Sequence, residues 1–221
     1  WNTSWVTKPQ FNLFFRGDYG ISKLTVPNFI PGSTLRQWDQ LRLRAGKNDA
    51  YDPFIVDEFM RRSLHATGAP APLGFFASVF INGEFKSYFN PTERPREPFY
   101  QEFYNSDSDW DVHYNNEWEN GDGVAYGPMR SFFLNNDFPS SPNYQQGAEY
   151  WDMVNVADYF IINTWAATQD WPHNNFTFAR ERKLGNRRLY AGGIAHRCFR
   201  GRQADKGRPD HLAVTLRFGG L

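Results

Sequence analysis

Cysteine is almost absent from the sequence, and long apolar runs are missing altogether. Cys198 is the only cysteine among the 221 residues. This excludes a disulfide framework and any zinc site built on cysteines. No stretch approaches the roughly 18 consecutive apolar residues that a membrane span needs, so we expect no transmembrane helix. Internal repeats and low-complexity segments are also missing.

Aromatic residues, by contrast, are abundant. They make up 18% of the chain, with 8 Trp, 11 Tyr and 21 Phe. A share this high excludes a disordered chain. The length suits one domain, or one domain of two lobes, with enough residues to bury a sizeable core.

The net charge is zero, with 24 basic and 24 acidic residues, but the two signs are unevenly distributed. Residues 1–179 hold 13 Lys and Arg against 21 Asp and Glu, whereas residues 180–221 hold 11 against 3. A basic end can bind nucleic acid. No aromatic stacking platform accompanies these arginines, so we do not expect nucleic acid as a partner. Residues 191–221 are then a solvated basic tail or a segment not native to the domain.

Local patterns predict a β-rich first part. Residues 10–15 and 40–44 have strand composition. A helix is expected from Asp52, which can cap it, to about Gly68. The strongest local signal is a hairpin, residues 75–81 and 84–89 around Asn82-Gly83, followed by a polar connector over 91–98.

The second part is expected to be more helical. Residues 105–150 are rich in polar residues and predict loops with short helices, and 154–166 predict a buried helix. A polar loop over 169–175 breaks this helix, and a last strand pair is expected at 176–180 and 187–190. The order of elements predicts an α+β fold.

The polar loop is the strongest candidate for chemistry. Asp170 and Asn175 are spaced as Asp-x-x-x-x-Asn, and Asn174 stands beside them. In phosphoryl transfer such an aspartate orients or deprotonates a hydroxyl, while the asparagine oxygen helps to hold magnesium. The alternative is an ordinary turn, which also favours Asp and Asn. His173 is either a base or a solvated loop residue.

Other candidates have equally plain alternatives. Lys8, just before a strand, can neutralise nucleotide phosphates or be an ordinary surface lysine. Glu93 follows the hairpin, where a protein of two lobes has its hinge. The aromatic residues of the middle segment fit either sugar binding or packing: Trp110, Tyr114, Trp118 and Tyr126.

An ordered series of segments resembles the CotH kinase family, the atypical protein kinases related to spore-coat protein H. The resemblance runs from about residue 8 to 190, and no single segment is decisive. Its pieces are KPQF (8–11), YGISKL (19–24), LRLRAGKND (41–49), TGAPAP (67–72), VFINGEF (79–85), YFNPTER (88–94) and NTWAATQDWPHNN (163–175).

The resemblance implies a kinase-like fold of two lobes, β-rich over 1–92 and mainly helical over 93–190. ATP would bind between the lobes, and its γ-phosphoryl group would pass to a protein hydroxyl with Mg²⁺ or Mn²⁺. Because members of the family are often exported or found on spore and cell surfaces, the resemblance suggests an extracellular, cell-surface or spore-surface location. It also implies roles for single residues. Lys8 would contact phosphates, and Glu58 would pair with Lys8 by analogy with the lysine–glutamate pair of ordinary kinases. Glu93 would lie at the nucleotide. Asp170 would serve catalysis or bind the metal, and Asn174 or Asn175 would help to hold the metal.

The sequence departs from the family pattern near Gly192-Gly193. There the family has an aromatic residue followed by a second metal-binding aspartate, whereas this chain has no acid until Asp205. A shifted reading frame is one hypothesis, because the codons GGT GGG ATN read two bases along give Trp-Asp. We therefore expect an impaired or truncated kinase domain. The alternatives are a non-catalytic pseudokinase or surface adhesion protein, and a carbohydrate-binding module.

Overall fold

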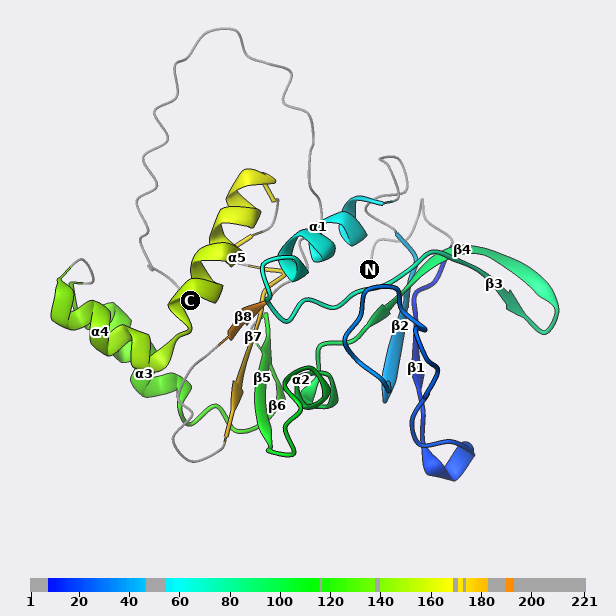
Figure 1. Ribbon diagram of the computed structural model, residues 1–221, viewed down its shortest axis with the longest axis horizontal. Helices are drawn as coiled ribbons and strands as arrows, with labels where there is room; N and C mark the ends of the chain where they lie inside the picture. The colour runs from blue at the N-terminus through cyan, green and yellow to red at the C-terminus, as the bar shows by residue number, and fades with distance from the viewer. Residues whose placement is uncertain are drawn as a thin grey trace, which may run out of the picture.

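Two antiparallel sheets form the framework of the protein, in a computed structural model that describes residues 8–46, 55–115, 117–137, 140–168, 171–172, 174–182 and 190–192. The sheets stand side by side, each with four strands, and helix α2 (Glu97–Tyr104) lies between them (Figure 1). Mixed helices and antiparallel sheets make this an α+β protein, as predicted.

The first sheet has the strand order β1-β2-β4-β3. Its strands are β1 (Phe11–Phe14), β2 (Gln40–Arg44), β3 (Ala77–Ile81) and β4 (Glu84–Glu93). A short 3₁₀ helix, η1 (Gly17–Tyr19), follows β1. The predicted hairpin is confirmed, because β3 and β4 turn at Asn82 and Gly83, both with positive φ. This hairpin projects beyond the rest of the sheet (Figure 1).

Strand β4 is longer than the sequence predicts, since it continues to Glu93 through part of the expected polar connector. Pro91 pairs with Leu43 of β2, and its carbonyl accepts a hydrogen bond from the Phe75 N–H at 3.1 Å. Neighbours on both sides thus extend the strand, although proline itself supplies no backbone donor.

The second sheet has the order β6-β5-β7-β8, with β5 (Trp110–Tyr114), β6 (Glu117–Asn120), β7 (Thr177–Glu181) and β8 (Tyr190–Gly192). For residues 105–150 the expectation of loops and short helices was incomplete, because β5 and β6 lie there. Strand β5 pairs with β7, more than 60 residues later in the chain. Such pairing leaves little trace in local composition.

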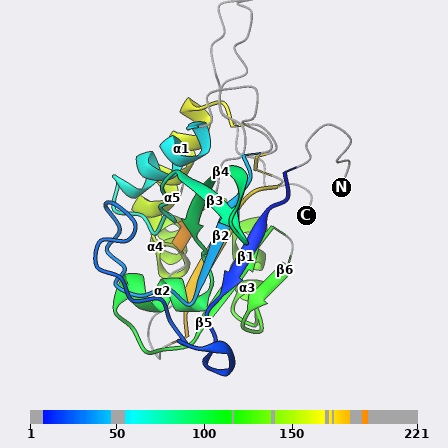
Figure 2. The same ribbon diagram turned by 90° about the vertical axis from the view of Figure 1, so that its right-hand side faces the viewer.

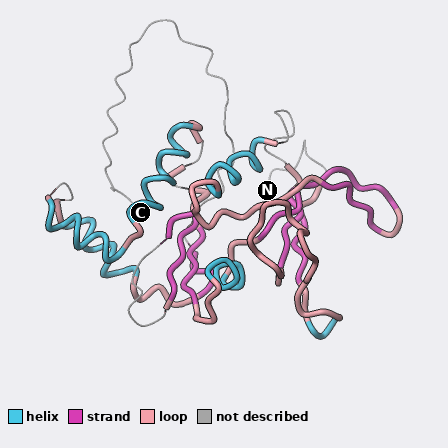
Figure 3. Tube along the Cα trace, in the orientation of Figure 1, coloured by secondary structure: helices cyan, strands magenta, loops and turns pink. Residues whose placement is uncertain are grey.

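Five helices are found in the described residues, and Figure 3 separates them from the strands. They are α1 (Val56–His65), α2, α3 (Tyr126–Asn135), α4 (Ser141–Tyr150) and α5 (Met153–Trp165). Helix α5 confirms the predicted helix over 154–166, but the expectation that it is buried was wrong, because Val154, Ile161 and Trp165 are exposed. The predicted cap Asp52 lies outside the described residues. None of the described helices has the length and apolar character needed to cross a membrane.

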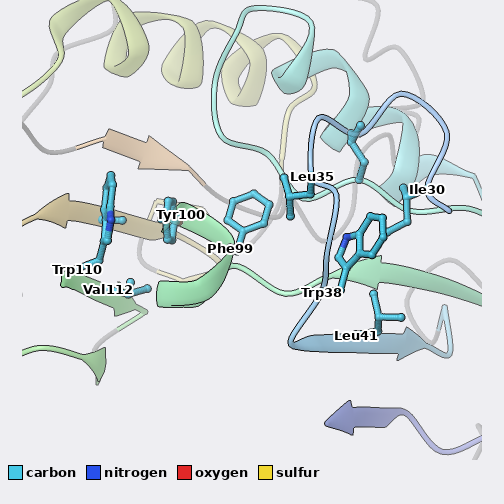
Figure 4. Close-up of a cluster of buried hydrophobic side chains, with 10 residues drawn as sticks. Ile30, Leu35, Trp38, Leu41, Phe99, Tyr100, Trp110 and Val112 are labelled. Atoms are coloured by element: carbon cyan, nitrogen blue, oxygen red, sulfur yellow. The ribbon is translucent and has the colours of Figure 1, made fainter. Parts of the chain in front are cut away.

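A continuous row of buried side chains joins the two sheets (Figure 4). Seen from the side of the first sheet, the second sheet lies behind it (Figure 2). The row runs from the first sheet through α2 to the second: Ile30, Leu35, Trp38, Leu41, Leu73, Phe99, Tyr100, Trp110, Val112 and Ala179. Tyr100 of α2 stacks on Trp110 of β5 with ring centroids 5.4 Å apart. Helix α2 therefore fixes the sheets relative to each other.

Candidate functional site

The loop after α5 is held firmly where it begins. Ala166 is fully buried, and the Thr168 N–H donates to the Asn163 carbonyl at 3.1 Å. The Asn163 side-chain amide in turn donates to the Tyr159 carbonyl at 2.8 Å. Asp170 and His173 lie outside the described residues, so their roles stay predictions.

The same loop is also anchored where it ends. The indole of Trp171 donates to the Tyr159 hydroxyl at 3.0 Å and packs on Phe160. Further on, the Phe176 N–H donates to Oδ1 of Asn115 at 3.2 Å, and the Asn115 N–H donates to the Phe176 carbonyl at 2.9 Å. The described residues on either side of this loop are therefore fixed to α5 and to the second sheet.

Asn174 and Asn175 lie just before β7 and are half-buried. Asn175 has a left-handed backbone with φ 59°, which asparagine tolerates better than most residues. No hydrogen bond to another described residue engages either side-chain amide. Side-chain amide oxygens of this kind are ligands that a hard cation accepts.

Strand β8 places the position of the missing acid beside this loop. Gly192 pairs with Thr177, which is two residues beyond Asn175. Residue 192 is glycine, so no carboxylate lies at this position, and Gly193 lies outside the described residues. Within the described ranges, no group of three or more His, Cys, Asp or Glu side chains is close enough to hold a metal ion.

Lys8 lies at the edge of the first sheet. Its ammonium group donates to the Tyr88 carbonyl and stands 4.7 Å from the centroid of the Phe89 ring. Partial burial lowers the pKa of Lys8. These contacts tie Lys8 to β4, and the predicted contact with phosphates stays a prediction.

Glu58, the predicted partner of Lys8, is buried on α1. It forms ion pairs with Arg61 at 2.6 Å and Arg62 at 2.7 Å, and it accepts a hydrogen bond from the Gly74 N–H at 3.0 Å. Both of these ion pairs are with arginines of its own helix. The structure thus gives Glu58 a role in fixing α1 to the first sheet.

A separate buried ion pair, which the sequence did not predict, joins the first sheet to α1. Arg44 of β2 binds Asp57 of α1 at 2.5 Å, and Arg61 binds the same carboxylate at 2.7 Å. The alternation Gln-Leu-Arg-Leu-Arg places Arg42 and Arg44 on one face of the strand that precedes this helix. That pattern was the available signal for a basic residue facing α1.

Helix α1 also packs against α5. Met60 and Ala166 are both buried and belong to one cluster, together with Val56 and Ile162. The loop that contains Asp170 begins where α5 ends. The Arg44–Asp57 pair therefore involves the same helix, α1, that packs against the end of α5.

Glu93 ends β4 immediately before the connection to α2. Its buried carboxyl accepts hydrogen bonds from the Leu73 N–H at 2.8 Å, the Trp38 indole at 3.3 Å and the Ser33 hydroxyl. Burial raises the pKa of Glu93, against the lowering effect of these donors, and the nearby Glu58 raises it further. Glu93 thus holds three segments together at the point where the two sheets are connected.

A small hollow lies at this connection, with a volume of about 20 Å³. We call it the connector hollow. Its lining comes from the chain that leads into β2 and from the chain that runs from the end of β4 into α2. The lining residues are Leu35, Gln37, Trp38, Asp39, Gln40, Glu93, Arg94, Arg96, Pro98 and Phe99. It has room for about one water molecule or one ligand oxygen.

Comparisons with known proteins do not assign a family to the chain. No family model matches the chain, and no curated protein shows significant similarity to it.

Proposed function

We propose that the chain is a CotH-like phosphotransferase that moves the γ-phosphoryl group of ATP to a protein hydroxyl, at a reduced rate. The observation that carries this proposal is the buried Arg44–Asp57 pair. In protein kinases a lysine on a strand forms an ion pair with a glutamate on a helix. This pair positions the lysine to contact the nucleotide phosphates. Here β2 and α1 supply such a pair.

The position of the polar loop supports the proposal. Helix α1 packs on α5, and α5 leads directly to the loop with Asp170. The described part of this loop is anchored at both ends, as a loop that positions a reacting group needs to be. Asp170 would orient the accepting hydroxyl, and Lys8 remains a second candidate for contact with the phosphates.

The reduced rate follows from Gly192. A divalent cation, Mg²⁺ or Mn²⁺, would neutralise charge on the phosphates, with Asp170, Asn174 and Asn175 as its protein ligands. The amide oxygens of the asparagines suit such an ion, but β8 adds no carboxylate at residue 192. Loss of one catalytic group commonly lowers rates by ~10²–10⁴-fold.

The test is transfer of labelled phosphate from ATP, with Mg²⁺ or Mn²⁺, to the chain itself and to a generic protein substrate. Label that appears with the unaltered chain and is lost in Asp170→Asn supports the proposal. Asp18→Asn is the matched control, because Asp18 is an exposed acid of η1, and it is expected to transfer label normally. Equal labelling by the unaltered chain and Asp170→Asn would overturn the assignment of Asp170.

A non-catalytic relative is the second candidate, and Gly192 favours it. Such a pseudokinase or surface-binding protein would bind ATP without transferring phosphate. Calorimetry with ATP separates the outcomes. Binding without transfer identifies the pseudokinase, whereas no binding removes both kinase-like readings and leaves the carbohydrate-binding module.

A further inference from the structure

Three arginines gather where the first sheet is connected to α2. Arg42 lies on β2 opposite Thr92 of β4. Arg94 follows directly after β4 and contacts Gln40, two residues before Arg42 on β2. Arg96 is the next basic residue along the chain, and both Arg94 and Arg96 line the connector hollow. Arg42 itself does not line the hollow, but it lies on the strand that begins there.

Two of these arginines lack a carboxylate partner. Arg94 donates to Oε1 of Gln40 at 2.6 Å, and Arg42 donates to Oδ1 of Asn12 at 3.3 Å, so their hydrogen bonds go to neutral amides. No described carboxylate comes within 4.0 Å of either guanidinium group, whereas Arg96 forms an ion pair with Glu119.

Arg94 also has an unused donor. Its Nε is buried and has no hydrogen-bond acceptor among the described residues. The ring of Phe14 lies 5.4 Å from its guanidinium carbon, which favours the cation but offers no acceptor to an N–H group. A buried donor without an acceptor costs about 1–3 kcal/mol, so an oxygen placed there would be strongly favoured.

The arginines disfavour one another's charge. Burial lowers the pKa of Arg94, and Arg42 lowers it further. For Arg96, burial together with Arg94 and Arg42 lowers the pKa to about 10. An anion between these groups would offset both the burial and the repulsion.

Two acids line the connector hollow, and both are engaged. Asp39 accepts from the Gln40 side-chain amide at 3.0 Å. Glu93 accepts hydrogen bonds from its three donors, and burial raises its pKa. The hollow admits little more than one oxygen atom. The fitting ligand is therefore a compact oxyanion that inserts one oxygen and leaves the others to the arginine side chains.

We propose that Arg94 and Arg42 form an anion site that takes a phosphate group. A guanidinium group matches two oxygens of a phosphate with two parallel N–H donors, and the charge of phosphate exceeds that of a carboxylate. The phosphate is either free or carried as an ester. The site uses neither Asp170 nor the Arg44–Asp57 pair, so it is independent of the proposed phosphoryl transfer.

The test is calorimetric titration with inorganic phosphate, with O-phosphoserine and with acetate, at constant ionic strength. We expect saturable binding of one phosphate per chain, and weaker binding of acetate. Tighter binding of O-phosphoserine than of inorganic phosphate would identify an ester as the ligand, and the reverse order would identify the free ion. Variants of the arginines separate this site from the proposed catalytic loop, which contains neither Arg94 nor Arg42.

Variants locate the site. Arg94→Gln and Arg42→Gln are expected to weaken phosphate binding at least 10-fold. Arg94→Lys keeps the charge but loses the paired donors, so it should bind with intermediate affinity. Arg36→Gln is the matched control, since Arg36 is exposed, lies in the segment before β2 that contributes to the lining, and does not itself line the hollow. It should change the affinity less than 2-fold. Absence of saturable binding by the unaltered chain, or undiminished binding by a folded Arg94→Gln or Arg94→Lys variant, would overturn the proposal.

Discussion

At the scale of single residues, the aromatic rings packed around His113 determine its protonation state. His113 lies on β5 and is 7% exposed to solvent. Its ring stacks on that of Phe178, with ring centroids 4.4 Å apart. Trp118 meets it edge-on at 4.8 Å. Burial lowers the pKa of His113 to about 4, and its buried Nδ1 has no partner among the described residues. His113 is therefore neutral at pH 7.

This predicts a pH dependence of stability. Between about pH 6.5 and pH 4 the unfolded chain binds a proton at His113 and the folded chain does not, so acidification over this window destabilises the fold. The loss due to His113 is at most about 3 kcal/mol. His113→Phe keeps the ring stack and removes the proton. Urea unfolding at pH 7 and pH 4.5 should therefore show a smaller loss in the variant, whereas equal losses would contradict the assignment.

At the scale of elements, α1 is fixed to the first sheet by buried charge. Arg61 is fully buried between Asp57 and Glu58 of its own helix, and it also donates to Asn90 of β4. Arg44 approaches Asp57 from β2. Removing the central cation would leave two buried carboxylates with fewer partners, which is far more costly than losing an exposed ion pair.

We accordingly expect Arg61→Ala to lower the free energy of unfolding by about 3–5 kcal/mol. Arg62→Ala is the matched control, because Arg62 binds Glu58 with its side chain 40% exposed. Because Arg62 also donates to the Gly74 carbonyl at 2.7 Å, this second variant should lose about 1–2 kcal/mol. Denaturant unfolding measures both, and similar losses in the two variants would mean that the buried network does not fix α1.

At the scale of the whole molecule, the buried row through α2 makes the two sheets one cooperative unit. Phe99 lies in the middle of this row, 4% exposed (Figure 4). Two bodies with separate cores would unfold independently, whereas one continuous core unfolds in a single transition.

We predict coincident denaturant transitions by tryptophan fluorescence and far-ultraviolet circular dichroism. Phe99→Ala should lower the free energy of unfolding by about 3–5 kcal/mol. Phe80→Ala, at an exposed position of the β3–β4 hairpin, is the control and should change it by about 0.5 kcal/mol or less. Two separate transitions in the unaltered chain would show that the sheets unfold independently.

Local patterns alone were sufficient for several elements. The Asn82-Gly83 turn, the alternating strand before α1 and the apolar helix over 154–166 all appear as expected. Each depends on residues close in the chain, through backbone conformation at a turn or the periodicity of apolar side chains. The α+β class follows from the same local information.

Only the tertiary structure decided which charges meet and which polar segments become strands. Strand β5 exists because β7 pairs with it, and Arg44 and Asp57 meet because α1 folds back onto β2. Glu58, chosen by analogy, instead binds the arginines of its own helix. Residue types and their order in the chain determine which local elements can form. Contacts between distant segments depend on packing of the whole core, which no local pattern encodes.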